Sequence, residues 1–336
     1  MISTWLKLRK KGVLGLNARN REFVMKHNPR HSYPLVDDKL RTKKLALAAG
    51  IAVPELYGTV TTPHDLARLE NILAGRSSFV MKPAHGSGGE GVLVIDSRRR
   101  DLYVKTDGRA LSLEDIEYHA SNIMSGIYSL GGVSDTAMIE YRVCVDPVLE
   151  PMSYRGVPDI RVLVYRGVPS LAMIRLPTRN SDGKANLHQG AVGVGIEIAT
   201  GITTDGVWLN RRVNEHPDFG MPLAGLQIPN WPSLLELAAR SYELTHLGYL
   251  GVDIVLDRDY GPLILELNAR PGLAIQIANQ CGLALRLAKV DALDIIPTAA
   301  RDRVDQTCRL FGTNGADALT AAPAATDGSA PLATEV

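Results

Sequence analysis

The sequence predicts an α+β fold rather than a parallel, doubly wound sheet. Segments with strand and helix patterns alternate along the chain, but without the regular strand–helix–strand repeat that a parallel sheet requires. The apolar runs 251–257 and 263–268 flank a turn near 259–261 and predict a hairpin. The alternating segments 159–165 and 170–176 predict further strands.

The composition is that of an ordinary folded chain. Of the 336 residues, 45% are apolar and 22% are charged, which suggests about two domains and excludes disorder of the whole chain. Lys and Arg (37) balance Asp and Glu (36), so we do not expect a nucleic-acid binder. The chain has no CxxC pair, no apolar run of 18 residues and no signal-peptide pattern. We therefore expect a cytoplasmic protein without a membrane span.

The first half of the chain is expected to begin with a basic helical extension, residues 1–36. We expect it to dock on its own domain, and a membrane-surface helix is the alternative. A helix should begin near Asp37 and Asp38, acids suited to a helix N-terminus, and end at Gly50. The other elements expected here are helices at 66–73 and 112–130 and strands at 79–82, 92–95 and 137–143.

The second half contains the four strands named above and two predicted helices, at 233–247 and 283–298. From Thr313 onward the composition changes. The last 24 residues include eight Ala and no Lys, Arg or aromatic residue, which is typical of a disordered tail.

Acidic side chains gather on one face of the predicted hairpin. Because side chains alternate along a strand, Glu266 and Asn268 share a face, and an antiparallel register places Asp253 opposite them. Two carboxylates that face each other in an apolar sheet repel, and a hard divalent cation would relieve that repulsion. Oxygen ligands favour Mg²⁺ or Mn²⁺ shared with phosphate over zinc. The alternative is a solvated sheet face with ordinary acids.

A glycine-rich loop lies between two predicted strands. Gly86, Gly88 and Gly91 match GxGxxG, but a strand follows the loop, whereas a Rossmann fingerprint requires a helix. A strand–glycine loop–strand unit is typical of a flap whose backbone N–H groups contact phosphate. Lys82 precedes the loop and would neutralise phosphate charge. The alternative is a structural glycine-rich hairpin.

Further polar residues fit a nucleotide site less specifically. Glu140, on a predicted strand, would accept a hydrogen bond from the exocyclic amine of adenine; an ordinary strand with an outward Glu is the alternative. Cations near a metal–phosphate site stabilise the charge that develops in phosphoryl transfer. The polar residues of the second half that suit this role are Arg161, Arg175, Lys184, Asn186, His188 and Arg270.

Taken together and in this order, the motifs resemble the ATP-grasp superfamily, and within it the RimK-type, α-L-glutamate-ligase-like proteins. The resemblance covers about residues 37–300. The motifs that carry it are DKLRTK from Asp38, VMKP from Val80 with the glycine loop, IEY from Ile139, DIR from Asp159, KANLHQG from Lys184, GVD from Gly251 and ELNARPG from Glu266.

The resemblance implies an ATP-grasp fold, in which two α+β subdomains hold ATP between them. These would be residues 37–140 with the flap and residues 141–312 with the metal site, while the extension 1–36 replaces a full preceding domain and 313–336 form the tail. It implies one or two Mg²⁺ (or Mn²⁺) ions on Asp253, Glu266 and Asn268. Arg161, Arg175 and Arg270 would stabilise the transferring phosphoryl group and orient a carboxylate. ATP would be bound by Lys39, Lys82, Gly86, Ser87, Gly88, Gly89, Gly91, Glu140, Tyr141, Asp159, Lys184 and Asn186, with Glu150 as the alternative to Asp159 at the ribose.

The resemblance also implies a reaction. A carboxylate and ATP would form an acyl phosphate, which an amine attacks to give an amide and phosphate; glutamate, another amino acid or a peptide would be a substrate. The sequence departs from the RimK-type pattern at Lys184 and Gln189, where arginines are usual, and in the long segment between Tyr141 and Asp159. The short extension implies that the acid site is completed by the basic N-terminal helix or by a neighbouring subunit of a homo-oligomer.

Two other functions remain open at this point. One is an ATP-grasp transferase that acts on a sugar-linked or cell-envelope metabolite. The other is a nucleotide-binding module without turnover, against which the intact set of Asp253, Glu266 and Asn268 argues.

Overall fold

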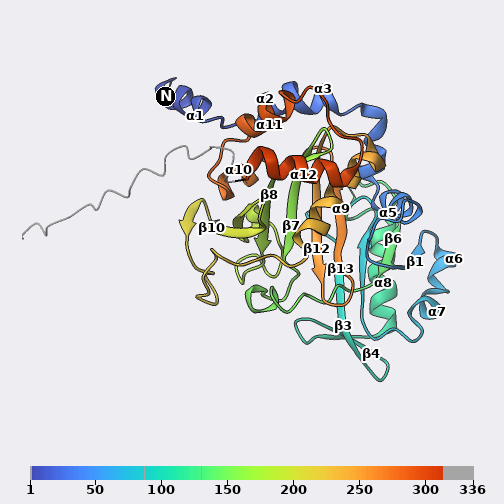
Figure 1. Cartoon of the computed structure of the whole chain (residues 1–336). Coiled ribbons are helices and arrows are strands. Elements are labelled where there is room, and N and C mark those ends of the chain that lie inside the picture. Colours follow the sequence, from blue (N-terminus) through green and yellow to red (C-terminus); the bar gives the residue numbers. More distant parts are fainter. Residues whose placement is uncertain (1, 87, 130, 313–336) are drawn as a thin grey trace, which may run out of the picture.

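The computed structural model describes residues 2–86, 88–129 and 131–312. Its strands form two antiparallel sheets, and helices cover them (Figure 1). The α+β prediction is confirmed. Ser87 of the glycine loop and the tail 313–336 lie outside the described residues.

The N-terminal segment consists of short helical pieces. Pro34 occupies the first position of helix α4, where its missing N–H costs nothing. Asp38 caps the helix that follows by accepting a hydrogen bond from the Arg41 N–H at 3.0 Å, as predicted for its start. The pieces are α1 (Ile2–Lys10), α2 (Leu16–Ala18), η1 (Arg19–Val24), α3 (Met25–His27), η2 (Arg30–Ser32), α4 (Pro34–Asp37) and α5 (Lys39–Ala48).

The first sheet has the strand order β1-β6-β2-β3-β4-β5. Its core forms where Phe79, Met81 and Ile95 of the sheet pack against Ile116 and Ile123 of helix α8. Strand β6 ends at Glu140, three residues earlier than expected. The elements are β1 (Leu56–Val60), α6 (Pro63–Leu66), α7 (Leu69–Leu73), β2 (Phe79–Pro83), β3 (Leu93–Arg99), β4 (Leu102–Lys105), β5 (Ala110–Leu111), α8 (Leu113–Met124) and β6 (Ala137–Glu140).

The second sheet has the order β11-β10-β9-β8-β7-β12-β13 and is covered on both faces. Val162 packs toward α9, whereas Leu163 packs toward η1 and α11. Three of its strands, β9 to β11, were not expected from the sequence. The elements are η3 (Glu150–Met152), β7 (Asp159–Tyr165), β8 (Val168–Leu176), η4 (Leu187–Gln189), β9 (Val192–Glu197), β10 (Ile202–Trp208), β11 (Arg211–Val213), α9 (Trp231–Thr245), β12 (Tyr249–Asp257), β13 (Gly261–Asn268), α10 (Ala274–Ala278), α11 (Leu283–Asp291) and α12 (Ala300–Phe311).

The helix expected at 283–298 is wrong in its second half. Helix α11 ends at Asp291, and a separate helix, α12, begins at Ala300. The buried guanidinium group of Arg303 on α12 donates to the carbonyls of Gly167 (2.9 Å) and Ala239 (3.2 Å). Helix α12 buries Arg303 and Thr307 beside Val304, so its buried face is largely polar and is missed when helices are predicted from apolar residues.

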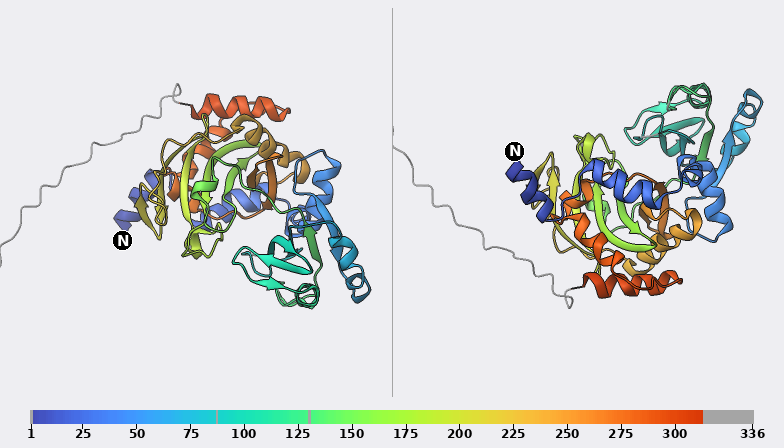
Figure 2. Two further views of the ribbon diagram at one scale, coloured as in Figure 1. Left: turned by 90° about the horizontal axis from the view of Figure 1, so that it is seen from below. Right: turned by 90° about the horizontal axis from the view of Figure 1, so that it is seen from above.

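The two sheets lie side by side rather than face to face. Figure 2 shows the first sheet and its helices as a separate lobe beside the second sheet. Helix α5 lies at the junction, where its side chains line a small cavity together with Lys82 of β2 and Leu265 of β13. Among the described residues, no helix is long and apolar enough to cross a membrane.

Candidate active site

A cavity of about 500 Å³ lies where the first sheet, helix α5 and strand β13 meet. Its lining comes from helix α4, the start of α5, the base of the glycine flap, the segment between α8 and β6, and the end of β13 with the two residues after it. Five of the predicted site residues border it, namely Lys39, Gly86, Glu266, Asn268 and Arg270. The remaining lining residues are Val36, Asp37, His85, Ser129, Val133, Ser134, Leu267 and Ala269.

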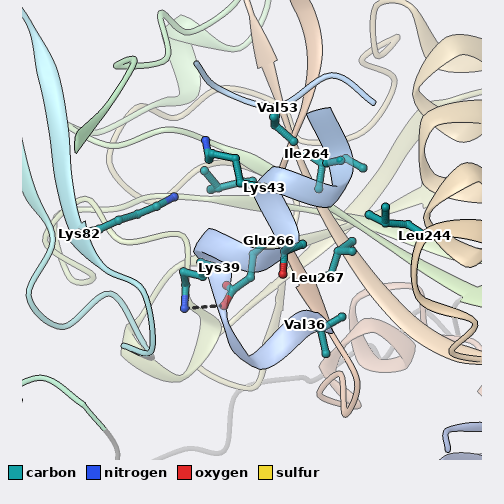
Figure 3. A pocket seen from close by; sticks show the side chains of 12 residues that line it. Val36, Lys39, Lys43, Val53, Lys82, Leu244, Ile264, Glu266 and Leu267 are labelled. Atoms are coloured by element: carbon teal, nitrogen blue, oxygen red, sulfur yellow. Dashed lines mark ion pairs between the residues drawn. The ribbon is translucent and has the colours of Figure 1, made fainter. Parts of the chain in front are cut away.

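Lys39 connects the two sides of this cavity. Its ammonium group donates to the Gly86 carbonyl at 2.5 Å. It also lies 3.3 Å from a Glu266 carboxylate oxygen, an ion pair that Figure 3 shows. The Lys39 ammonium therefore bridges the base of the flap and the acidic hairpin. An ammonium at this position suits the phosphate role that the resemblance assigns to Lys39.

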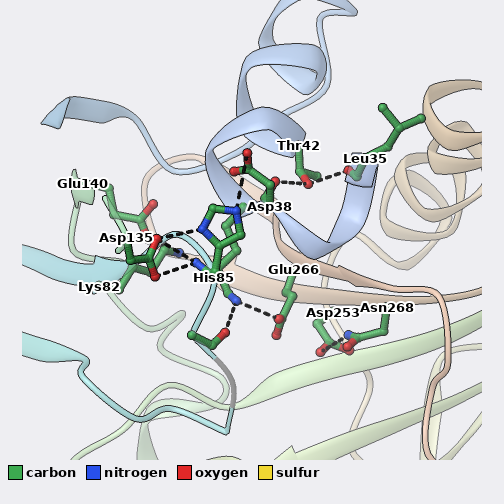
Figure 4. Close-up of polar contacts among 12 residues, drawn as sticks. Leu35, Asp38, Thr42, Lys82, His85, Asp135, Glu140, Asp253, Glu266 and Asn268 are labelled. Carbon is green, nitrogen blue, oxygen red and sulfur yellow. Dashed lines mark hydrogen bonds and ion pairs between the residues drawn. The ribbon is translucent and has the colours of Figure 1, made fainter. Parts of the chain in front are cut away.

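The hairpin of β12 and β13 has the register that places its polar residues on one face. Asp253 pairs with Glu266, and Gly251 pairs with Asn268. The Asn268 amide donates to Asp253 at 3.1 Å, and Figure 4 shows the three side chains in one row. The convergence expected from strand alternation is present.

Arginines, however, neutralise Asp253. Arg161, its partner on β7, binds both carboxylate oxygens at 2.7 and 2.6 Å, and Arg175 adds a contact at 3.0 Å. Burial opposes ionisation of Asp253, but the two guanidinium groups outweigh it and lower the pKa to about 2. The repulsion from which we predicted a cation is thus already relieved by arginines.

Asp159 belongs to the same buried network. It lies opposite Arg175, whose guanidinium group binds both of its oxygens, one of them at 2.6 Å. Burial raises the pKa of Asp159 to about 6, and the nearby charge of Asp253 adds to this effect while Arg175 opposes it. The carboxylate proposed for the ribose is therefore engaged by an arginine.

Two oxygen ligands face the cavity. Within the described part of the chain, no group of three or more His, Cys, Asp and Glu side chains is arranged to hold a metal ion. Glu266, whose side chain is 35% exposed, and Asn268 nevertheless line the cavity with hard oxygen donors. Mg²⁺ commonly takes one or two protein carboxylates and completes its shell with phosphates and water, so this pair fits it.

Glu140 is held between two lysines. Its buried carboxylate lies 2.5 Å from the Lys82 ammonium and 2.7 Å from that of Lys43. Burial opposes ionisation of Glu140, but both cations favour it, and the net effect lowers its pKa. Lys43 was not predicted, although its position four residues after Lys39 on one helix was a usable signal.

Tyr141, the neighbour of Glu140, packs edge-on against Tyr260, with ring centroids 5.3 Å apart.

The flap and the loop around Lys184 approach each other. The Lys184 ammonium lies 3.5 Å from the Glu90 carboxylate. Gly88, Gly89 and Gly91 have φ of 64°, 78° and 73°, a region that side chains with a Cβ avoid. Asn186 uses its side-chain oxygen within its own loop, where it accepts a hydrogen bond from the His188 N–H at 3.0 Å.

Two residues near the base of the flap, His85 and Asp135, were not predicted from the sequence. His85 lines the cavity, and its ring Nδ1 lies 2.8 Å from Asp135. Arg270, which was predicted, also borders the cavity and places its guanidinium group 4.9 Å from the centre of the Tyr33 ring. No sequence signal joins His85 to Asp135, because they are 50 residues apart.

The base of a glycine flap, the Lys39 ammonium and an acidic hairpin meet at one cavity, beside two antiparallel sheets, which is the arrangement of an ATP-grasp protein. The chain belongs to the sugar-transfer associated ATP-grasp family, whose profile matches residues 18–292.

Curated relatives are ligases of the expected branch. The chain is 23% identical over 248 residues to a probable alpha-L-glutamate ligase of Legionella pneumophila (strain Corby), an alignment that covers 74% of this chain and 60% of the relative. It is 26% identical over 250 residues to a ribosomal protein bS6–L-glutamate ligase of Shigella boydii serotype 4 (strain Sb227), covering 72% and 61%. The chain thus spans about three fifths of the length of these relatives.

Solved structures of ATP-grasp enzymes are also similar to the chain. A D-cycloserine synthetase shares 18% identity with a TM-score of 0.45, and the match covers 82% of this chain and 73% of the synthetase.

Proposed function

We propose that this protein is an ATP-dependent carboxylate–amine ligase that works through an acyl phosphate. One observation carries the proposal: Lys39 connects the flap at Gly86 to the acidic hairpin at Glu266 inside a cavity of about 500 Å³. A cation, a phosphate-binding flap and oxygen ligands then surround one volume. Phosphoryl transfer to a carboxylate requires these three kinds of group.

The proposed roles are those that the resemblance implies. Lys39, Lys82 and the flap glycines bind the ATP phosphates, and the segment at Glu140 and Tyr141 borders adenine. Asp159 contacts the ribose side of the nucleotide, and Lys184 and Asn186 approach the phosphates when the flap closes.

Glu266 and Asn268 would hold one or two Mg²⁺ ions, with Asp253 as the third residue of the proposed ligand set. The bound cation supplies charge neutralisation between the ATP phosphates. Arg161, Arg175 and Arg270 stabilise the transferring phosphoryl group and orient the carboxylate.

The chemistry explains why these groups are needed together. A carboxylate is a poor electrophile because its oxygen does not leave, and phosphorylation supplies the leaving group. The acyl phosphate must then be protected from water until the amine arrives. The flap, held from the other side by the contact between Lys184 and Glu90, suits this task.

The proposal divides the chain as the resemblance implied, with residues 37–140 and 141–312 as the two subdomains that hold ATP. It includes a cytoplasmic location. In support, Cys144, Cys281 and Cys308 are unpaired in the described structure, as expected in a reducing compartment.

Glutamate, another amino acid or a peptide is the proposed substrate class, which the names of the curated relatives support. A second candidate is an ATP-grasp transferase that acts on a sugar-linked or cell-envelope metabolite. The description of the family as associated with sugar transfer favours it.

An ADP-release assay tests the proposal. The protein is given ATP and Mg²⁺ with each amino acid, with short peptides and with amino sugars, and ADP is measured together with the product mass. We expect ADP to appear with an amide product for one acceptor class. Absence of both across the panel would contradict ligase activity, and ADP release only with amino sugars would select the second candidate.

A further inference from the structure

His85 lies where the reacting groups of the proposed ligation would meet. It is placed between β2 and the flap, next to Gly86, whose carbonyl accepts from Lys39. Its ring is half exposed and borders the same cavity as Glu266 and Asn268. No role has been assigned to it above.

The buried carboxylate of Asp135 holds this ring in one orientation. Asp135 accepts hydrogen bonds from the N–H groups of His85 (3.0 Å) and Thr136 (2.7 Å) and from the Ser129 hydroxyl (2.8 Å), and it lies 2.8 Å from the ring Nδ1. Burial opposes ionisation of Asp135, but these bonds prevail and lower its pKa. An ionised carboxylate only accepts, so Nδ1 carries the ring hydrogen.

The other ring nitrogen, Nε2, is therefore the basic atom. It lies 3.8 Å from an Asp38 carboxylate oxygen, beyond hydrogen-bond distance (Figure 4). Asp38 and Asp135 flank the ring on opposite sides. The other charged groups of the cavity are Asp37, Lys39, Glu266 and Arg270.

We infer that Nε2 of His85 accepts the proton of the incoming amine in the second half of the reaction, and that Asp135 positions the ring. This inference rests on the proposed ligase function. Nε2 first takes one proton from the ammonium group of the acceptor, which frees its lone pair. The lone pair forms the bond to the acyl carbon, and the bond from that carbon to the phosphate oxygen breaks. Phosphate leaves with the electron pair and takes up the second proton of the nitrogen. The imidazolium then returns its proton to solvent.

Hydroxylamine as the nucleophile distinguishes a general base from a residue that contacts the phosphates or the flap. It attacks acyl phosphates as a neutral nucleophile at neutral pH and has little need of a general base, whereas an amino acid must lose a proton from its ammonium group. The assay uses ATP-Mg with L-glutamate as the carboxylate, and it compares hydroxamate formation with peptide formation. We expect His85→Gln to slow peptide formation by about 10²- to 10⁴-fold and hydroxamate formation by less than about threefold.

Two accompanying results are expected. Asp135→Asn should show the same selective loss to a smaller degree, with the KM for ATP unchanged in both variants. His64→Gln, an exposed histidine on α6, serves as the matched control and should leave both products unchanged.

The outcomes are distinguishable. Equal losses of peptide and hydroxamate, or a raised KM for ATP alone, would assign His85 to the phosphates or to the flap instead. Unchanged peptide formation in a folded His85→Gln variant would overturn the inference and leave the ligase function standing. Failure of the wild type to form either product with any carboxylate of the amino-acid panel would overturn the ligase function, and the inference with it.

Discussion

Residues of opposite charge face each other across one face of the second sheet. Asp159 on β7 lies opposite Arg175 on β8, and Arg161 on β7 lies opposite Asp253 on β12. Opposite charges on neighbouring strands stabilise each other, and this lets two carboxylates remain buried. Glu266, next in the row on β13, contacts the Lys39 ammonium and borders the cavity. Among these carboxylates, we therefore regard Glu266 as the one most open to a ligand.

Replacing Glu266 tests that view. Glu266→Ala should reduce ATP turnover below a tenth of the wild-type rate, a loss of more than about 1.4 kcal/mol in transition-state stabilisation. The fold should persist, because a partly exposed ion pair such as that with Lys39 contributes only about 0–1 kcal/mol. Steady-state ADP release and thermal unfolding measure the two effects. Glu114→Ala, on the exposed side of α8, is the control, and turnover above a tenth in Glu266→Ala would refute the metal assignment.

The raised pKa of Asp159 predicts a dependence of stability on pH. Burial brings this pKa to about 6 in the folded protein, above its ordinary value. The folded state therefore binds this proton more tightly than the unfolded state, so the associated stability is complete below the unfolded pKa and is lost as pH rises through about 6. Asp253, whose folded pKa is lowered to about 2, changes stability only at lower pH.

Asp159→Asn removes the titrating group and isolates this effect. The free energy of unfolding of the variant, relative to wild type, should increase as the pH rises from about 4 to 7. Urea titrations at several pH values measure it. A difference that stays constant over this range would show that Arg175 keeps Asp159 ionised throughout.

Helix α5 and its capping residue contribute three charged side chains to the region where the two sheets meet. Asp38 caps its N-terminus, Lys39 contacts the flap and Glu266, and Lys43 reaches Glu140. Lys39 and Lys43 are four residues apart and so lie on the same side of the helix. One short helix thereby connects the phosphate side of the site to the segment proposed for adenine.

The flap is the element whose backbone conformation limits substitution. Gly88 has φ of 64° with open space around the position of a Cβ, so Gly88→Val is opposed by conformation rather than by a clash. A left-handed conformation costs an ordinary residue about 1–2 kcal/mol, and a β-branched one more. The variant should bind ATP more weakly and turn it over more slowly, with little change in global stability.

Gly108→Val is the matched control for this prediction, since Gly108 also has a positive φ (88°) and open surroundings, in the turn after β4. Isothermal titration with ATP-Mg compares the two variants. ATP affinity that is equal in Gly88→Val and wild type would remove the flap from the phosphate site.

The molecule as a whole holds its proposed nucleotide site between two sheets. Ion pairs between single side chains join the two parts of the molecule, such as Lys39 with Glu266 and Lys184 with Glu90. A ligand that binds both sides should therefore stabilise the folded state. At a concentration 100-fold above its Kd, the gain is about 2.7 kcal/mol.

ATP-Mg should thus raise the melting temperature in a saturable manner, and NAD should not. Thermal-shift titrations with the two ligands measure this, with magnesium alone as the control for ion effects. Stabilisation by NAD without stabilisation by ATP would favour the Rossmann interpretation of the glycine loop, which the strand β3 after the loop already disfavours.

The sequence alone determined the features that depend on near neighbours along the chain. The α+β class, the start of α5 at Asp38 and the hairpin that aligns Asp253 with Glu266 follow from capping and from strand alternation. These preferences act within a few residues and do not depend on distant parts of the chain. The motifs that resemble ATP-grasp proteins are likewise short and ordered.

The tertiary structure decided which partner each charge obtains. Asp253 could have been balanced by a metal or by a cation of the protein, and only the pairing of β7 with β12 brings Arg161 to it from 92 residues away. The same holds for His85 with Asp135 and for Arg303 on the unexpected helix α12. Periodicity indicates which side of an element is buried, but burial leaves each charge in need of a partner, and that partner is selected by contacts between segments far apart in the sequence.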